Sequence, residues 1–235
     1  MVVVLVLGDA YVPQRRPGFD ASVLDYIRHR QPDLILCTGN LGSPAVSRFF
    51  ERQTRTFYSV RGESDALEAP ERLILRIHDF TIGMLHGYQL ASNIAASGGS
   101  FLMDPFALRL IGADMGVDIL VAGGASSPQV ECFDTNTFAL KPRAILQPGS
   151  ITAAVPFPYT SQLQADPDIG IKAPLEPELS TKKYNIASRE GRGYPAMVLM
   201  DIEQNVAEIC SVTFRVDKDA SVCIGEKRRV HLFAP

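Results

Sequence analysis

Five short motifs rich in glycine and polar residues follow apolar segments in the chain, and their side chains are of the kinds that bind metal ions or catalyse hydrolysis. They are Gly8-Asp9, Gly39-Asn40, Gly62-Glu63, His86-Gly87 and Gly123-Gly124. Carboxylate and amide oxygens suit hard divalent cations, and imidazole nitrogens suit transition metals. If the motifs meet in space, they can hold a cation, or they can hydrogen-bond one another and the loop backbone.

The apolar segments before these motifs read as buried strands, because they are short and rich in β-branched residues. Helical spacing separates the early ones, and the order strand, helix, strand predicts an α/β fold whose first half has a largely parallel sheet. The carboxyl ends of such strands share one edge, where ligands bind. We therefore expect Asp9, Asn40, Glu63 and His86 to converge on one pocket.

The complete prediction covers both halves of the chain. Strands are expected at 2–7, 33–38, 56–60, 72–77, 81–85, 117–122, 130–133, 137–140, 144–146, 197–202 and 206–214, with a last pair near Val222 and Val230. Helices are expected at 19–30, 43–51 and 104–115. The strands at 130–133, 137–140 and 144–146 read as hairpin-like, and those from 197 onward read as antiparallel because of their alternation and turn residues.

Composition excludes several classes of protein. The 235 residues are 46% hydrophobic and 21% charged, with a formal net charge of -3, so no basic surface predicts nucleic-acid binding. No apolar run approaches the roughly 20 residues that span a bilayer. The apolar start at residues 1–7 lacks a basic flank and a cleavage site, and it is predicted to be a strand and not a signal peptide. The four cysteines are widely spaced, which favours free thiols.

The chain is expected to form a single domain over residues 1–235 with two loop insertions. Residues 92–100 are small, polar and glycine-rich, and residues 156–193 are rich in proline and charge with little periodicity. A stretch of that length without periodicity is typical of a loop or a binding appendage.

Several longer motifs carry a resemblance to a known family. LVLGD at 5–9, ILCTGNL at 35–41, VRGESD at 60–65, IGMLHGYQ at 82–89, VDILVAGG at 117–124, QPGSITAA at 147–154 and VLMDI at 198–202 occur in the order found in one family. The chain resembles the calcineurin-like metallophosphoesterases, and among them the phosphoesterase-fold subunits of retromer. This resemblance implies a β-sandwich of two mixed sheets flanked by helices.

The resemblance also implies that the metal site has been lost in part. Asp9 and His86 match the family's metal ligands, and Glu63 stands where the family has a ligand asparagine. A bridging aspartate is replaced by Asn40, a neutral amide that bridges two cations poorly. Histidines of the family are replaced at four positions, which are Tyr11, Ser64, Gly124 and Ser126. We therefore predict a vestigial metal pocket of Asp9, Asn40, Glu63 and His86, with no catalytic residue, metal or cofactor.

Two alternatives remain open for this pocket. The chain could be a metal-dependent phosphodiesterase with a reduced metal site, or it could hold a single hard ion on Asp9, Glu63 and Asn40.

The remaining implications of the resemblance concern partners. Leu90 and Ala91 match the loop that seats the α-solenoid subunit of retromer, and Val2, Tyr26, Leu199, Cys210 and Val212 match an apolar surface patch that binds regulatory proteins. The expected function is a non-catalytic scaffold in endosomal protein sorting, cytoplasmic and peripheral on endosomes. Membrane contact is expected only through partners, and a free-standing adaptor is a further alternative.

Overall fold

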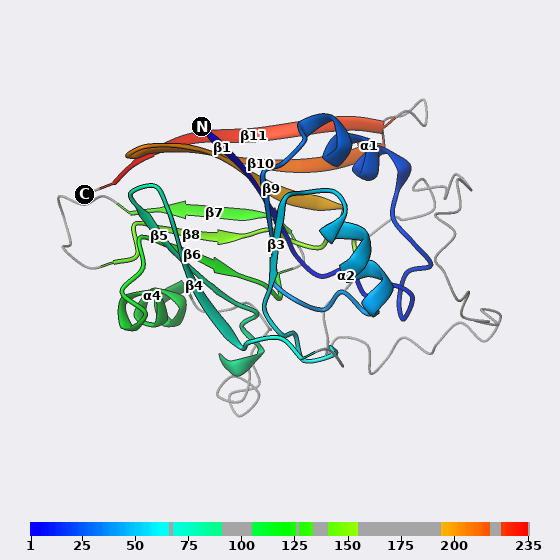
Figure 1. The fold of residues 1–235 in the computed structure, drawn as a ribbon, viewed down its shortest axis with the longest axis horizontal. Helices are drawn as coiled ribbons and strands as arrows, with labels where there is room; N and C mark the ends of the chain where they lie inside the picture. The colour runs from blue at the N-terminus through cyan, green and yellow to red at the C-terminus, as the bar shows by residue number, and fades with distance from the viewer. Residues whose placement is uncertain are drawn as a thin grey trace.

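Two mixed β-sheets packed face to face form the centre of the molecule (Figure 1). The computed structural model describes residues 1–65, 68–90, 105–125, 127–133, 141–154, 194–216 and 222–234. The expected insertions 92–100 and 156–193, and the strand expected at 137–140, lie outside these residues. The two packed, mixed sheets confirm the fold class inferred from the sequence.

The first sheet has six strands in the order β11-β10-β9-β1-β2-β3. β1, β2 and β3 run parallel, and β9, β10 and β11 continue the sheet in antiparallel pairs beside β1. Its strands are β1 (Val2–Leu7), β2 (Leu34–Cys37), β3 (Thr56–Ser59), β9 (Ala196–Glu203), β10 (Val206–Val216) and β11 (Val222–Phe233).

The second sheet has five strands in the order β4-β5-β6-β8-β7. β5, β6 and β8 are parallel, and the two edge strands β4 and β7 are antiparallel to their neighbours. Its strands are β4 (Arg72–Ile77), β5 (Phe80–Leu85), β6 (Ile119–Ala122), β7 (Gln129–Cys132) and β8 (Ala144–Gln147).

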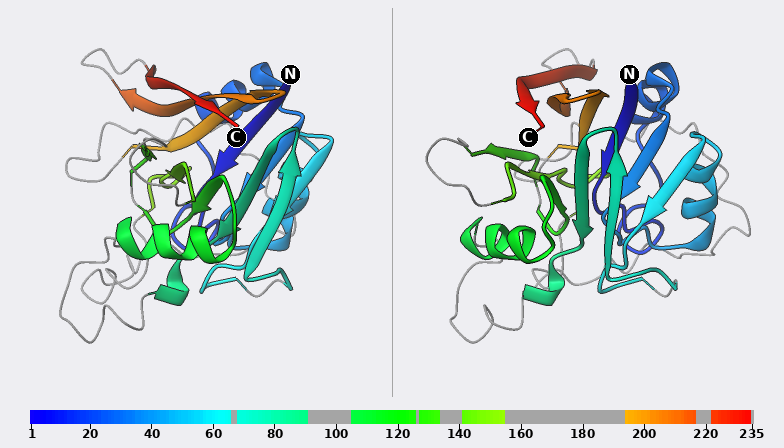
Figure 2. Two further views of the ribbon diagram at one scale, coloured as in Figure 1. Left: turned by 90° about the vertical axis from the view of Figure 1, so that its left-hand side faces the viewer. Right: turned by 60° about the vertical axis from the view of Figure 1, so that its left-hand side comes forward.

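Helices cover the outer faces of the two sheets (Figure 2). α1 (Ala21–Arg30) begins at Asp20, whose side chain accepts a hydrogen bond from the Ser22 amide at 2.9 Å, a typical N-cap. α2 (Pro44–Glu51) begins with proline, which lacks the amide hydrogen that a first turn leaves unpaired. These two pack on the first sheet, and α4 (Pro105–Asp114) packs on the second.

Alternation along the strands divides the core into separate clusters. In β1, Val4 and Val6 point between the sheets, whereas Leu5 and Leu7 point toward the helices. The second sheet has a smaller third cluster of Leu85, Leu108, Val117, Leu120, Ala122 and Ile145 beneath α4, with Leu90 packed against its edge. Alternate side chains of β1 therefore belong to different clusters of the core.

One expectation about the strands was wrong. The segment from Val222 to Val230 is not a pair of strands but part of the continuous strand β11, which pairs with β10 along its whole length. Its register with β10 shifts between Cys210 and Ser211, a β-bulge or irregularity that does not interrupt the strand. The antiparallel pairing of β9 with β10 agrees with the prediction for these segments, and β9 joins them to the parallel strands by pairing antiparallel with β1.

Within the described ranges, no helix is both long and apolar enough to cross a membrane. Among the described residues, Cys37, Cys132 and Cys210 take part in no disulfide, in line with the wide spacing of the cysteines.

Candidate functional site

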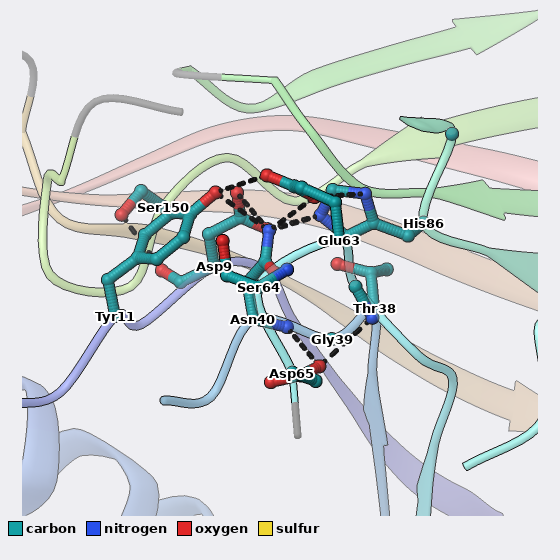
Figure 3. A network of polar contacts seen from close by, with 12 residues as sticks. Asp9, Tyr11, Thr38, Gly39, Asn40, Glu63, Ser64, Asp65, His86 and Ser150 are labelled. Atoms are coloured by element: carbon teal, nitrogen blue, oxygen red, sulfur yellow. Dashed lines mark hydrogen bonds and ion pairs between the residues drawn. The ribbon is translucent and has the colours of Figure 1, made fainter. Parts of the chain in front are cut away.

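Four strand ends meet in one polar network, in which Asp9, Asn40 and His86 are buried and Glu63 is partly exposed (Figure 3). Asp9 follows β1, Asn40 follows β2, Glu63 lies beyond β3 and His86 follows β5. β1, β2 and β3 are parallel, so their carboxyl ends share one edge, and β5 contributes its end from the facing sheet. The four side chains that the sequence predicted to converge do so.

The amide nitrogen of Asn40 lies at the centre of this network. Its Nδ2 is 2.9 Å from Glu63 Oε2, 2.7 Å from His86 Nε2 and 3.4 Å from Asp9 Oδ2. Its Oδ1 accepts a hydrogen bond from the Ser64 amide at 3.0 Å, which fixes the orientation of the side chain. The Asn40 oxygen is thus used by the backbone, and its nitrogen faces the carboxylates and the imidazole.

Tyr11 fills the same pocket from the β1 side. Its hydroxyl donates to Glu63 Oε1 at 2.9 Å and accepts from Asn40 Nδ2 at 2.7 Å, and its ring is buried. Burial, together with Asp9 and Glu63, raises the pKa of the phenol well above its usual range. The phenol therefore remains a neutral donor, and its hydroxyl takes a place in the network where the family has an imidazole.

His86 forms an ion pair with Asp9. Nε2 is 3.1 Å from Asp9 Oδ1, Nδ1 is 3.3 Å from Glu63 Oε2, and the Asp9 and His86 side chains are almost completely buried. Burial disfavours the charged imidazolium, but Asp9 and then Glu63 outweigh it and raise the pKa of His86. The carboxylates thus favour the protonated imidazole, whose positive charge offsets part of theirs.

The loop after β3 is held tightly against Asn40. Asp65 Oδ2 accepts hydrogen bonds from the Asn40 and Gly62 amides at 2.6 and 2.9 Å. A Cβ at Gly62 would overlap the Asn40 side chain, so only glycine fits there. Asn40 itself has φ of 54°, a left-handed conformation that asparagine tolerates better than most residues.

The segment after β8 supports the loop that carries Asp9. Ser150 Oγ donates to the Asp9 carbonyl at 2.9 Å, and Thr152 Oγ1 donates to the Ala10 carbonyl at 2.8 Å. The sequence singled out neither residue for this role, because each lies about 140 residues from its partner. It did not single out Asp65 either. A motif search restricted to strand ends cannot detect such support.

The residues present do not fit a two-metal centre. A cation bound by Asp9, Glu63 and His86 needs bond lengths near 2.0–2.2 Å, and the Asn40 nitrogen already stands within 2.7–3.4 Å of all three. Gly124, at one expected histidine position, has no ligand atom in its side chain, and Ser126 lies outside the described residues. Within those residues, no group of three or more His, Cys, Asp or Glu is arranged to hold a metal ion.

The predicted docking loop is described only in part. Leu90 ends the 3-10 helix η1 (Tyr88–Leu90) and is partly buried against the third cluster, while Ala91 lies outside the described residues. Leu90 is therefore both accessible and a packing residue.

The apolar residues expected on a second surface do not form one exposed patch. Tyr26, Leu199, Cys210 and Val212 are buried in the core between α1 and the first sheet, where Tyr26 packs edge-on against Phe214 at 5.5 Å. Val2 is partly buried on the opposite face, against the core between the sheets. Strand alternation separates Val2 from the others, which corrects this prediction.

Comparisons with known proteins agree with this geometry. Residues 4–112 match the calcineurin-like phosphoesterase superfamily domain. A probable metallophosphoesterase of Methanocaldococcus jannaschii is 28% identical over 148 residues, which cover 63% of this chain and 67% of the relative.

Solved structures extend the likeness to the whole chain. Chaetomium thermophilum Vps29 has a TM-score of 0.71 at 17% identity and covers 100% of this chain and 98% of its own. Entamoeba histolytica Vps29 complexed with Zn²⁺ has a TM-score of 0.66 at 22% identity and covers 96% and 98%. The chain therefore has the calcineurin-like phosphoesterase fold in the form seen in Vps29.

Proposed function

We propose that this Vps29-like phosphoesterase fold acts as a non-catalytic scaffold that binds the C-terminal part of retromer's α-solenoid subunit. The observation that carries the proposal is the neutral Asn40 amide at the centre of the former metal pocket. A two-metal hydrolase needs a bridging anion and an acid near the leaving group, and Asn40 and Ser64 supply neither. The likeness to Vps29 structures supports the partner class.

The scaffold role places the protein in the cytoplasm and peripherally on endosomes, with membrane contact only through its partners. The docking loop after β5 lies next to the polar network, since His86, the first residue beyond β5, belongs to both. Contacts among protein side chains hold the base of this loop. Binding is therefore expected to be insensitive to chelators.

Calorimetric titration against the C-terminal half of the solenoid subunit tests the proposal. We expect a saturable interaction that is unchanged by EDTA. Absence of binding by the purified wild-type chain would contradict the retromer role. Co-purification from native lysate separates this role from a free-standing adaptor that never joins the complex.

A metal-dependent phosphodiesterase is the second candidate, and the probable metallophosphoesterase relative favours it. Hydrolysis of an aryl phosphodiester in the presence of Mn²⁺ distinguishes the two functions. Turnover that requires Mn²⁺ and is lost in Asp9→Ala would overturn the scaffold assignment. We expect no turnover above the buffer rate.

A further inference from the structure

Glu71 holds the loop after β5 by two contacts. The Tyr88 hydroxyl donates to Glu71 Oε1 at 3.1 Å, and Gln89 Nε2 donates to the Glu71 carbonyl at 3.3 Å. Gln89 Oε1 in turn accepts from the Gly87 amide at 2.9 Å. Three successive residues after His86 are thus connected, directly or through Gln89, to one residue at the start of β4.

The position of Glu71 explains why it can hold this loop. Arg72 pairs with Leu85 at the open end of the β4–β5 hairpin, so Glu71 and His86 are the next residues on the two strands. The neighbouring Pro70 carbonyl accepts from the Arg61 amide at 2.8 Å, which anchors the segment before Glu71. Glu71 is therefore a fixed point from which the loop can be held.

The held loop presents the predicted docking residue. The Leu90 amide donates to the Gly87 carbonyl at 2.9 Å, and the Leu90 side chain packs against the edge of the third cluster. A single turn with one internal hydrogen bond has little stability of its own. The contacts to Glu71 supply order that the turn lacks.

We infer that Glu71 is a positioning residue for partner binding, which acts by accepting the Tyr88 hydroxyl and thereby fixes the turn that ends in Leu90. The inference rests on the proposed docking function and adds the residue pair that organises the loop. Glu71 is exposed, and Tyr88→Phe keeps the ring that lies 5.8 Å from the His86 ring, so these replacements leave the buried network of Asp9, Asn40 and His86 intact.

Hydrogen exchange tests the positioning role without any partner. Tyr88→Phe and Glu71→Ala each remove the hydrogen bond between the Tyr88 hydroxyl and the Glu71 carboxylate. Its loss should speed exchange of the Leu90 amide roughly three- to tenfold. Glu71→Gln retains an acceptor and should restore slow exchange. The double variant should exchange no faster than either single one, because both remove the same bond. Tyr58→Phe, at an exposed tyrosine on β3, is the matched control.

The binding experiment uses the same variants and the C-terminal half of the solenoid subunit. Glu71→Ala and Tyr88→Phe should weaken binding by a similar factor at an unchanged melting temperature, and Glu71→Gln should bind as wild type does. Unchanged Leu90 exchange in both single variants would overturn the inference whatever the binding result. Fast exchange in the variants, with no binding even by wild type, would instead refute the proposed function.

Discussion

At the scale of single residues, the site is decided by which atom stands at its centre. Asn40 donates from its amide nitrogen toward Asp9 and Glu63, where a carboxylate would repel them. His86 Nε2 lies 3.1 Å from Asp9 Oδ1, and the carboxylates raise the pKa of His86, which favours the protonated imidazole. Groups of the protein itself therefore pair most polar atoms of the pocket, although the buried His86 Nδ1 and Asp65 Oδ1 make no hydrogen bond within the described part of the chain.

Asn40→Asp should convert this network into a metal-binding site. Three carboxylates and one imidazole would then converge, so that the metal-free protein loses about 1–3 kcal/mol of folding free energy while Mn²⁺ or Zn²⁺ gains a ligand. Differential scanning fluorimetry should show a melting temperature that is lower than wild type in EDTA and rises with metal. Asn40→Ala is the control, and a metal response of equal size there would rule out the explanation.

The raised pKa of His86 predicts a pH dependence of stability. The folded protein holds this proton more tightly than the unfolded chain does, so the stabilisation is complete below about pH 6.5, the ordinary histidine value. It is lost as pH rises through the raised pKa of the folded state. Urea unfolding at pH 6 and pH 9 should show a decrease in wild type that His86→Gln lacks. Equal pH dependence in both proteins would exclude His86 as its source.

At the scale of secondary-structure elements, alternation along a strand decides which apolar residues are available to a partner. Leu199 and Val212 face α1, and Val2 faces the other sheet. A partner surface that needs all three on one face cannot form while the strands hold this register, because neighbouring positions point to opposite faces.

Leu199→Ala tests whether this face is core or surface. Leu199 is only 4% exposed, so its truncation should lower the free energy of unfolding by about 2–5 kcal/mol. Ile224→Ala on β11, where the side chain is 47% exposed, should cost less than about 1 kcal/mol. Chemical denaturation of both variants makes the comparison. If Leu199→Ala lowered the free energy of unfolding by less than Ile224→Ala does, Leu199 would be a surface residue and not part of the core.

At the scale of the whole molecule, the two ends of the chain complete one sheet. β1 is central, and β9, β10 and β11 from the C-terminal part extend the sheet beside it. Leu232 near the end of β11 is buried in the core between the sheets, and Arg143 before β8 donates to the Phe233 carbonyl at 2.6 Å. The last strand thus connects with both sheets.

A chain that ends at residue 221 should therefore lose its cooperative fold. It would lack the burial of Leu232 and would expose the whole of β10 as an unpaired edge, a template for aggregation. Circular dichroism should show no sharp melting transition, and size exclusion should show aggregates. A chain that lacks only Pro235 serves as the control. Monomeric, cooperative unfolding of the shorter chain would show that β11 is dispensable.

The sequence by itself determined most elements and the composition of the polar site. Strand ends with glycine and a polar residue located Asp9, Asn40, Glu63 and His86, because parallel strands bring their carboxyl ends to one edge. Local patterns also gave α1, α2 and α4 to within a few residues. These features depend on neighbours in the chain, which a sequence displays directly.

Only the tertiary structure decided what depends on residues far apart. That the Asn40 nitrogen and not its oxygen faces the carboxylates follows from the Ser64 amide, 24 residues away. The support of the Asp9 loop by Ser150, the continuity of β11 across its bulge and the burial of Leu199 depend on pairings across the sheets. Such pairings are set by long-range packing, so no local pattern in the sequence contains them.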